Sequence, residues 1–390
     1  MSSQIRRQRE WLGPGPKRRL IGGGFARPAV IMLAVMLAAS LSVAMYIVAL
    51  AQVGSSIHSS TGFTDRSFEF INLGHLGGPA NAVDTDGAYA YVGFANELAV
   101  MEVQDPIQRI GYVLVETKIE DILVTAGYAY IAAGKSGLWV VDILNPRIPE
   151  LIGHLDTPGY AHGLAKVANV LYLADGVGGL RIISVIDPST PIEIGSILLP
   201  GHGLGIASSG RYAYVAIAEK GLQVVDVANP GQPVLLGSHD TSGLALNVVV
   251  RHQTAYIADG LGGLKLVDIT APDSPESISG LGVGGTAKDL FLDAGLAYVA
   301  ADDAGLVIVD VSSPLNLTQK GTISTTSRSV SIAKFDQTIL MANWSEGLQL
   351  IDVTDPGNPL WVSGYEPPAN ARGGIEAAGR TVYVGDDMGI

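Results

Sequence analysis

Carboxylate side chains recur at one place in this 390-residue sequence, in the short turns between the second and third apolar segments of a repeating unit. Those that could ligate a metal ion are Asp175, Asp259, Asp302, Asp303, Asp386 and Asp387. Because Ca²⁺ prefers oxygen ligands, turns gathered around one axis would form an acidic rim able to bind this cation. Asp-Gly pairs are also common in hairpin turns, and the sequence has no D-x-D-x-D-G calcium loop. The alternative is therefore turn chemistry without any cofactor.

Further polar residues are candidates for a binding face at the same end of the repeating units. They lie in the same turns or in the links between successive units, and they are Glu97, His162, His202, Glu219, Asp240 and Glu346. Loops carried by a rigid scaffold are where binding residues usually lie. We therefore expect this end of the molecule to contact a partner.

A second repeated acid ends an apolar segment four residues before a proline. Its copies are Asp142, Asp226, Asp268, Asp310 and Asp352. A functional interpretation would be a ring of carboxylates. A carboxylate at a strand end can instead accept hydrogen bonds from backbone N–H groups of the following turn. Since two units replace the aspartate by Glu102 and Ser184, we favour the structural interpretation.

Motifs for catalysis are absent from the sequence. There is no cysteine, which excludes disulfides, thiolate metal sites and a cysteine nucleophile. The histidines form neither H-x-H nor H-E-x-x-H, and no G-x-S-x-G nucleophile elbow occurs. We therefore expect a protein that is not an enzyme. The alternative is a hydrolase or lyase whose catalytic residues come from several loops.

The chain after residue 67 is one internal repeat. A block that starts with Gly-Leu and ends with proline occurs as GLWVVDILNP, GLQVVDVANP, GLKLVDITAP and GLVIVDVSSP, among other copies. Its six prolines, from Pro146 to Pro356, are each 42 residues apart. A second block, such as AYVAI or AYIAD, lies just upstream of most copies. A fixed period of this length indicates a repeat architecture rather than several independent domains.

Each unit contains four short segments with the composition of β-strands, separated by Gly, Pro, Asn and Asp. The spacing leaves no room for crossover helices, so the strands are antiparallel. We predict an all-β propeller of seven to eight four-stranded blades over 67–390. The eighth unit stops where its third strand should begin, while 67–74 has the pattern of a fourth strand. A seven-bladed ring, a defective shared eighth blade and an incomplete chain all remain open.

Glycine is abundant, with 49 residues in the chain. It recurs at equivalent positions such as Gly153, Gly195 and Gly237. We interpret these glycines as turn residues at strand ends, where glycine reaches unusual φ values at little cost.

The blocks GLVIVDV (305–311), GLQVVDV (221–227) and GLKLVDI (263–269) resemble the LVIVD repeat family. The resemblance covers about 67–390 and departs from the family pattern at Leu340, where a tyrosine is usual. It implies a β-propeller in an exported or cell-surface prokaryotic protein. It implies no particular chemistry.

The first 50 residues carry a topology signal. A tail, 1–27, with seven basic residues and one acid precedes the uncharged stretch 28–50. A helix of that length rises about 34 Å and would cross a ~30 Å hydrocarbon core. The basic tail is expected to stay cytoplasmic, and a flexible linker, 51–66, leads to an exported domain. The alternative is a signal peptide cleaved after Ala49-Leu50-Ala51, which would give a secreted protein.

Composition limits the partners. From residue 51 onward, 17 basic against 36 acidic residues give a net charge of −19, which disfavours nucleic acid. Hydrophobic residues make up 47% of the chain and charged residues 16%, which excludes intrinsic disorder. We predict a membrane-anchored, exported binding or scaffold module for protein or glycan partners at the cell surface. A Ca²⁺-dependent binding module is the alternative.

Overall fold

The computed structural model describes residues 79–104, 106–366, 375–378 and 381–384. Internal contacts divide the chain into Met1–Phe68 and Glu69–Ile390, and every described residue belongs to the second unit. The predicted basic tail, membrane helix, linker and strand at 67–74 therefore lie outside the described residues. Within the described part of the chain, no helix is long and apolar enough to cross a membrane.

The described strands form seven sheets of four, which we number as blades 1 to 7 in chain order. Blade 1 contains β1 (Ala80–Thr85), β2 (Tyr89–Phe94), β3 (Glu97–Glu102) and β4 (Gln108–Leu114). Blade 2 contains β5 (Asp121–Thr125), β6 (Tyr128–Ala132), β7 (Leu138–Asp142) and β8 (Glu150–Leu155). Blade 3 contains β9 (Gly163–Val167), β10 (Val170–Ala174), β11 (Leu180–Ser184) and β12 (Ile192–Ile197). Blade 4 contains β13 (Gly203–Ser209), β14 (Tyr212–Ile217), β15 (Gly221–Asp226) and β16 (Val234–His239), with the 3₁₀ turn η1 (Ala218–Lys220) between β14 and β15. Blade 5 contains β17 (Asn247–Arg251), β18 (Thr254–Ala258), β19 (Leu264–Asp268) and β20 (Glu276–Leu281). Blade 6 contains β21 (Asp289–Asp293), β22 (Leu296–Ala300), β23 (Leu306–Asp310) and β24 (Thr318–Ile323). Blade 7 contains β25 (Ser331–Phe335), β26 (Thr338–Asn343), β27 (Gly347–Asp352) and β28 (Leu360–Tyr365).

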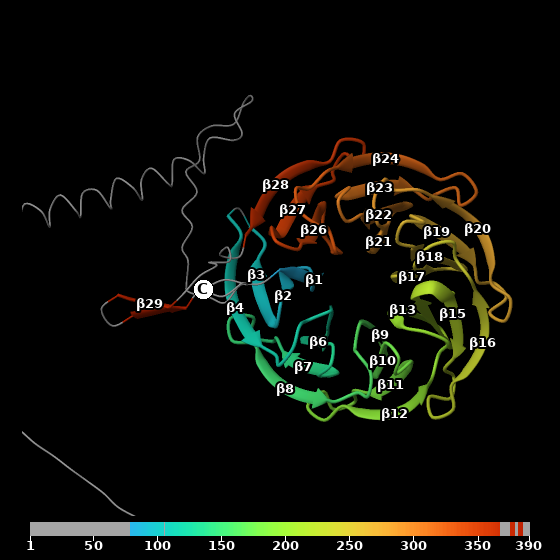
Figure 1. The fold of residues 1–390 in the computed structure, drawn as a ribbon, viewed down its shortest axis with the longest axis horizontal. Coiled ribbons are helices and arrows are strands. Elements are labelled where there is room, and N and C mark those ends of the chain that lie inside the picture. The colour runs from blue at the N-terminus through green and yellow to red at the C-terminus, as the bar shows by residue number, and fades with distance from the viewer. Residues whose placement is uncertain (1–78, 105, 367–374, 379–380, 385–390) are drawn as a thin grey trace, which may run out of the picture. The chain divides into compact units, whose positions relative to one another are not determined.

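The seven sheets form the blades of a ring, with the first strand of each blade nearest the centre and the fourth at the outside (Figure 1). In every blade the strands pair antiparallel in chain order, so the predicted all-β propeller is confirmed with seven blades. β29 (Ile375–Ala378) and β30 (Thr381–Val384) pair only with each other, as expected for the first two strands of an eighth unit. The alternative of an eighth blade within the ring is wrong.

The ring closes by direct contact between blades 1 and 7. β1 packs against β25 and β26. The Ala80 amide donates a hydrogen bond to the Trp344 carbonyl across this junction, at 2.8 Å. Buried side chains, among them Phe94, Met101 and Leu340, fill the same junction. Because this junction is filled, no shared blade is needed, and Leu340 at the usual tyrosine position contributes to the closing core.

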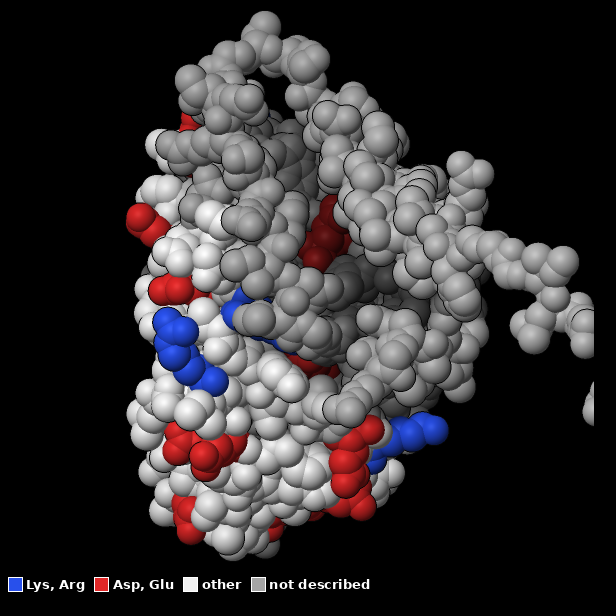
Figure 2. Space-filling model, turned by 90° about the vertical axis from the view of Figure 1, so that its left-hand side faces the viewer, with Lys and Arg blue, Asp and Glu red and all other residues white. Residues whose placement is uncertain are grey.

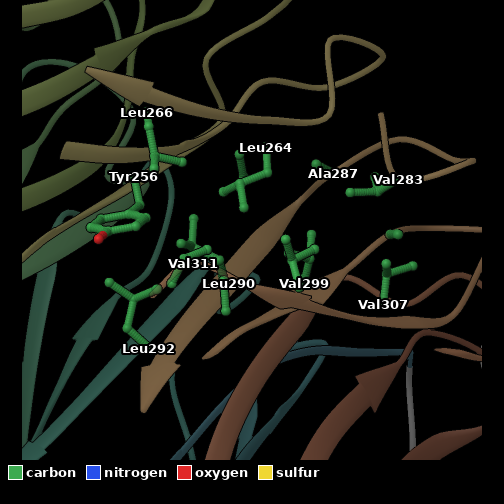
Figure 3. Close-up of a cluster of buried hydrophobic side chains, with 14 residues drawn as sticks. Tyr256, Leu264, Leu266, Val283, Ala287, Leu290, Leu292, Val299, Val307 and Val311 are labelled. Carbon is green, nitrogen blue, oxygen red and sulfur yellow. The ribbon is translucent and has the colours of Figure 1, made fainter. Parts of the chain in front are cut away.

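Apolar side chains of facing blades meet in clusters, and the described residues place one cluster at each of the seven junctions. Between blades 5 and 6, Tyr256, Leu264 and Leu266 pack against Leu290 and Val299 (Figure 3). Each blade therefore covers its neighbour, which explains why the inner strands are apolar on both faces. Burial of apolar surface, about 25 cal/mol per Å², is the main term that stabilises such a ring.

Glycines in the fourth strands allow blades to approach closely, and they do not lie in turns as predicted. Three examples, inside β8, β12 and β16, are Gly153, Gly195 and Gly237. A Cβ atom on Gly195 would lie 1.8 Å from the Pro230 carbonyl oxygen of the next blade. In β20 the position is Ser279, whose hydroxyl donates a hydrogen bond to the Pro314 carbonyl. The repeated proline thus presents its carbonyl to the preceding blade, where only a small residue fits.

The strand-end aspartates have the structural role that the sequence predicts. Each carboxylate accepts a hydrogen bond, at 2.7–3.0 Å, from the amide two residues later: Asp142 from Leu144, Asp226 from Ala228, Asp268 from Thr270, Asp310 from Ser312 and Asp352 from Thr354. The Ser312 hydroxyl and amide lower the pKa of Asp310 to about 2, because both donate to its charged form. These carboxylates hold the turns that follow the third strands.

Candidate functional site

One side of the ring gathers the links between blades and the turns between second and third strands, and we call it the linker face. Backbone pairing joins a turn to the link that follows it, for example Gly176 to Gly203 and Gly260 to Ala287. The amides of Gly176 and Gly203 each donate to the carbonyl of the other, at 3.1 Å. The predicted meeting of these two sets of loops is therefore confirmed.

Asp175 is buried beneath the linker face instead of standing on a rim. Its carboxylate accepts hydrogen bonds from the Thr157 hydroxyl (2.6 Å), the Gly159 amide (2.9 Å) and Arg181 Nε (3.2 Å). These donors occupy the oxygens that a cation would need. The carboxylate thus ties together the link before β9, the turn after β10 and the third strand of the same blade.

Asp259 has the equivalent place in blade 5. It is fully buried, and the Thr241 hydroxyl donates to its carboxylate. Burial raises the pKa of Asp259, while the hydrogen bond from Thr241 and the charge of Lys265 oppose the shift. Lys265 lies at the position that Arg181 has in blade 3. The described residues hold no group of three histidine or acidic side chains suited to a metal ion.

Asp302 is neutralised by basic side chains from two links. Arg328 donates through Nε to Oδ1 at 2.9 Å and through Nη2 to Oδ2 at 3.2 Å. The Lys288 ammonium lies 3.7 Å from Oδ2. The neighbouring Asp303 is exposed. A buried carboxylate with two cations beside it is a structural ion pair, since its charge is already balanced.

Glu97 is neutralised in the same way in blade 1. Its side chain is 1% exposed and lies 2.7 Å from Arg109, which extends from the fourth strand. Of the predicted acidic rim, Glu97, Asp175, Asp259 and Asp302 are therefore buried, while Glu219, Asp240 and Asp303 are exposed. The basic partners lie outside the turns, on links and on outer strands, so the pattern of the turns alone does not show them.

The remaining predicted residues are dispersed over the linker face. His202, Glu219 and Asp240 are exposed on the turn and links of blades 3 to 5. Glu346 is partly buried, and burial raises its pKa. Asp386 and Asp387 lie outside the described residues, so their role as metal ligands stays a prediction.

The links converge on a cavity of about 370 Å³ where the central channel opens on the linker face. Every blade contributes to its wall. The charged and aromatic residues there, which we call the channel mouth, are Lys118, Glu120, Asp121, His162, Lys288, Asp289, Arg328 and Trp344. Of these, the sequence predicted only His162 as a binding residue. The structure thus moves the centre of the candidate site from the turns to the links.

Glu120 organises one side of the channel mouth. The Tyr160 hydroxyl donates to Oε1 at 2.6 Å and the Lys118 ammonium to Oε2 at 2.9 Å. The Tyr160 ring centre lies 4.7 Å from that of His162. Burial lowers the pKa of His162, so that its ring is mainly neutral at pH 7.

Arg328 and Trp344 form another side of the channel mouth. The guanidinium carbon lies 5.6 Å from the centre of the Trp344 ring, which is the geometry of a cation–π contact. The Trp344 side chain is 42% exposed, so part of its surface is open to a ligand. Leu204 and Leu246, from blades 4 and 5, add an apolar arc to the wall.

Carboxylates of the first strands join neighbouring blades around the channel. They accept hydrogen bonds of 2.7–2.9 Å from the first strand of the next blade: Asp84 from Val124, Asp121 from Leu164 and Asp289 from Ile332. Burial raises the pKa of all three carboxyl groups, that of Asp84 to about 6, and repulsion from Asp289 adds to the shift at Asp84 and Asp121. Three half-buried carboxyl groups of the inner ring thus have pKa values above that of an exposed aspartate.

The signal that identifies these inner positions is the repeat itself. One register position on the channel wall recurs every 42 residues as Asp121, Gly163, Gly205, Asn247, Asp289 and Ser331. At the glycines the inner strands come closest, since a Cβ atom on Gly163 would lie 2.4 Å from the Leu204 carbonyl oxygen. The acidic turns are more conspicuous in the sequence, which is why these positions were not predicted.

A second cavity, of about 400 Å³, opens on the opposite face between blades 4 and 5. Arg211, Tyr212 and His252 line it, and none of them was predicted as a site residue. Arg211 is paired with Asp226, one of the strand-end aspartates.

On the outer surface coloured in Figure 2, charged side chains are less concentrated than at the channel mouth. Figure 2 shows acidic and basic side chains singly or in small groups among uncharged residues. The channel mouth differs because its cations and aromatic rings come from several blades that meet at one opening.

The fold is similar to that of solved structures with little sequence identity. The crystal structure of the computationally designed Ika8 protein aligns with a TM-score of 0.59 and 10% identity, over 81% of this chain and 96% of that one. A chain in the crystal structure of the mitotic checkpoint complex aligns with a TM-score of 0.59 and 13% identity, over 75% of this chain and 100% of that one. At such identities the likeness concerns the fold alone. A search of curated protein sequences finds no match.

The comparison with protein families gives a specific result. The model of the LVIVD repeat matches six segments: 77–107, 118–157, 158–198, 200–241, 242–279 and 284–325. Together they span more than half of the chain, and each segment corresponds to one of blades 1 to 6. The resemblance stated from the blocks of the sequence is confirmed. The chain belongs to the LVIVD repeat family.

Proposed function

We propose that this chain is an exported, membrane-anchored binding module whose linker face contacts a protein or glycan partner and which catalyses no reaction. The observation that carries the proposal is the channel mouth. Links, inner strands and one turn from the seven blades bring charged, aromatic and apolar side chains to one cavity of about 370 Å³. Concave sites of roughly 300–1,000 Å³ with a few convergent polar groups are the usual form of ligand sites.

The regular repeat supports binding over catalysis. The six prolines are each 42 residues apart, which leaves no insertion among these units that would build a separate catalytic loop. The acids of the channel mouth are engaged by other groups: Glu120 by Lys118 and Tyr160, and Asp121 by two backbone amides. A general base needs a carboxylate that can reach a substrate proton.

Export and anchoring are supported by the sequence. The basic tail before the uncharged stretch 28–50 predicts that the propeller lies on the extracytoplasmic side. Protease added to intact cells should then digest the propeller, and the full chain should sediment with membranes. Protection of the propeller would contradict export. A mature chain that starts at Gln52 would contradict the anchor and leave export standing.

Site-specific photo-crosslinking on intact cells tests the binding face. A photoreactive amino acid at His202 or Asp240, both exposed on the linker face, should give a discrete cross-linked product. The same amino acid at Gln253, exposed in the first turn of blade 5 on the opposite face, is the matched control. Products from the linker face alone support the proposal. No product from either linker-face position, or equal products from Gln253, would overturn it.

A further inference from the structure

We infer that the channel mouth binds the carboxylate of an acidic sugar residue at the end of a glycan. The inference rests on the proposed function and names the class of ligand that the same site accepts.

The carboxylate oxygens of the wall already have donors. Both oxygens of each carboxylate accept a hydrogen bond, for Glu120 from Lys118 and Tyr160, for Asp121 from the amides of Ile122 and Leu164, and for Asp289 from the amides of Leu290 and Ile332. Asp302, behind the wall, is held by Arg328 through both oxygens. A ligand that brings only donors would therefore compete with protein donors for these oxygens.

The donors of the wall have unused capacity. An ammonium group has three N–H bonds and a guanidinium five. Lys118 donates one to Glu120, and Arg328 donates two to Asp302. Lys288 lies 3.7 Å from its nearest carboxylate oxygen. The wall thus offers N–H groups of three cations to a ligand that supplies acceptors, and charge-assisted hydrogen bonds favour an anion.

The repeat shows that the fold does not require cations at these positions. The residues at the repeat position of Lys118 are Tyr160, His202, Leu244, Thr286 and Arg328 in the next five units. The residues at the position of Lys288 include Glu120, His162, Leu204, Leu246 and Val330. One position carries six different side chains and the other carries five, so neither position is set by packing. Cations at three of them, around one opening in an acidic chain, indicate a ligand of negative charge.

The apolar part of the wall and its shape favour a sugar over an extended acidic peptide. Leu204, Leu246 and the exposed part of Trp344 offer a surface for the C–H face of a sugar ring, while the cations offer partners for its carboxylate. Residues of all seven blades line this open cavity of about 370 Å³, so the ring surrounds a bound group on its sides. A compact sugar residue at the end of a glycan suits such an opening better than an extended chain does.

Titration calorimetry with the full chain in detergent tests this inference. Digalacturonate is the probe, its neutral methyl ester is the matched ligand, and a tetrapeptide of Asp and Glu is the third. We expect digalacturonate to bind at least about tenfold more tightly than either of the other two, and its affinity to fall as salt screens the cations.

Two double variants with equal loss of charge complete the test. Lys118→Gln/Lys288→Gln should weaken digalacturonate binding about tenfold, because it removes two of the three cations that face the ligand. The Arg328–Asp302 pair stays intact in this variant. Arg211→Gln/Lys320→Gln removes two cations away from the channel mouth and should leave the affinity unchanged.

The outcomes separate the inference from the proposed function. Tighter binding of the peptide, equal binding of the methyl ester, or equal effects of the two double variants would overturn the inference. If cross-links from the linker face persist in that case, the proposed function stands with another ligand. If the cross-linking and the titration both give the contrary result, the proposed function and the inference are both overturned.

Discussion

One position in the fourth strand is glycine in five blades and serine in the other two, and its five glycines lie against the proline carbonyl of the next blade. These residues are Gly111, Gly153, Gly195, Gly237, Ser279, Gly321 and Ser363. At the channel mouth, the position that starts at Lys118 recurs with the same regularity and carries a different residue in each unit up to Arg328. The first position lies against backbone. At the second position, Lys118 and Arg328 line an open cavity. Two positions with the same 42-residue spacing therefore have different constraints. Packing sets the residue in the fourth strand, whereas the position of Lys118 is available for recognition.

The largest expected effect is at the seam between blades. Gly195→Ala should destabilise the protein by about 3 kcal/mol or more, because its Cβ atom would lie 1.8 Å from the Pro230 carbonyl oxygen and backbone must move. Gly231→Ala is the control, since its nearest contact would be 3.6 Å. Thermal unfolding of both variants measures the difference. Equal melting temperatures would break the distinction between packed and open positions.

The half-buried carboxyl groups of the inner ring should make stability depend on pH. The pKa of Asp84 is raised to about 6 in the folded protein from an unfolded value of 3.8. Its contribution to stability is therefore greatest below about pH 4 and is lost as pH rises through about 6. Relative to Asp84→Asn, the wild type should lose on the order of 2–3 kcal/mol of unfolding free energy between pH 4 and 7.

Denaturant unfolding of both proteins across this pH range provides the measurement. The difference between the two chains isolates Asp84 from exposed acids such as Asp310, whose pKa is lowered and whose contribution has the opposite sign. If the unfolding free energies of the two proteins change in parallel with pH, the pKa of Asp84 is not raised in the folded protein.

A smaller effect is expected at the channel mouth. Lys118→Gln/Lys288→Gln should change the unfolding free energy by no more than about 1 kcal/mol. Lys118 is 47% exposed, and after loss of Lys288 both oxygens of Asp302 still accept hydrogen bonds from Arg328. Thermal unfolding checks this directly. A loss comparable to that of Gly195→Ala would mean that the mouth is structural, and the contrast between the two regions would disappear.

The smallest effect concerns calcium. A cation that binds the folded state raises the melting temperature by mass action. Because Asp175, Asp259 and Asp302 are engaged by hydroxyl, amide and basic groups, millimolar Ca²⁺ should leave the melting temperature unchanged within about 1 °C. A clear rise in the melting temperature would support the metal site predicted from the turns, with Asp386 and Asp387 as its next candidate ligands.

Much of the fold could be predicted because the constraints that produce it are local and repeated. The four strands per unit, their antiparallel pairing and the turns closed by residues such as Asp268 follow from composition and the 42-residue period. The number of blades could not be predicted. It depends on whether blade 1 meets blade 7, and this contact joins residues as distant as Ala80 and Trp344.

The candidate site was predicted in its location on the fold but only in part in its residues. The links and the turns between second and third strands do share one face, as the topology of a four-stranded blade requires. The acids that the sequence makes conspicuous, Asp175 above all, are buried partners of hydroxyl and basic groups. Their neutralising cations lie on other strands and links, where no local pattern points to them.

The sequence by itself determined the repeat, the strands, the turns and the family, because each depends on residues within one unit. Only the tertiary structure decided which of the equivalent positions meet. Ring closure brings Lys118, Lys288 and Arg328, from blades 2, 6 and 7, to one opening. The physical reason is that a closed ring adds contacts between units far apart in the chain, and the chemistry of the channel mouth exists only through those contacts.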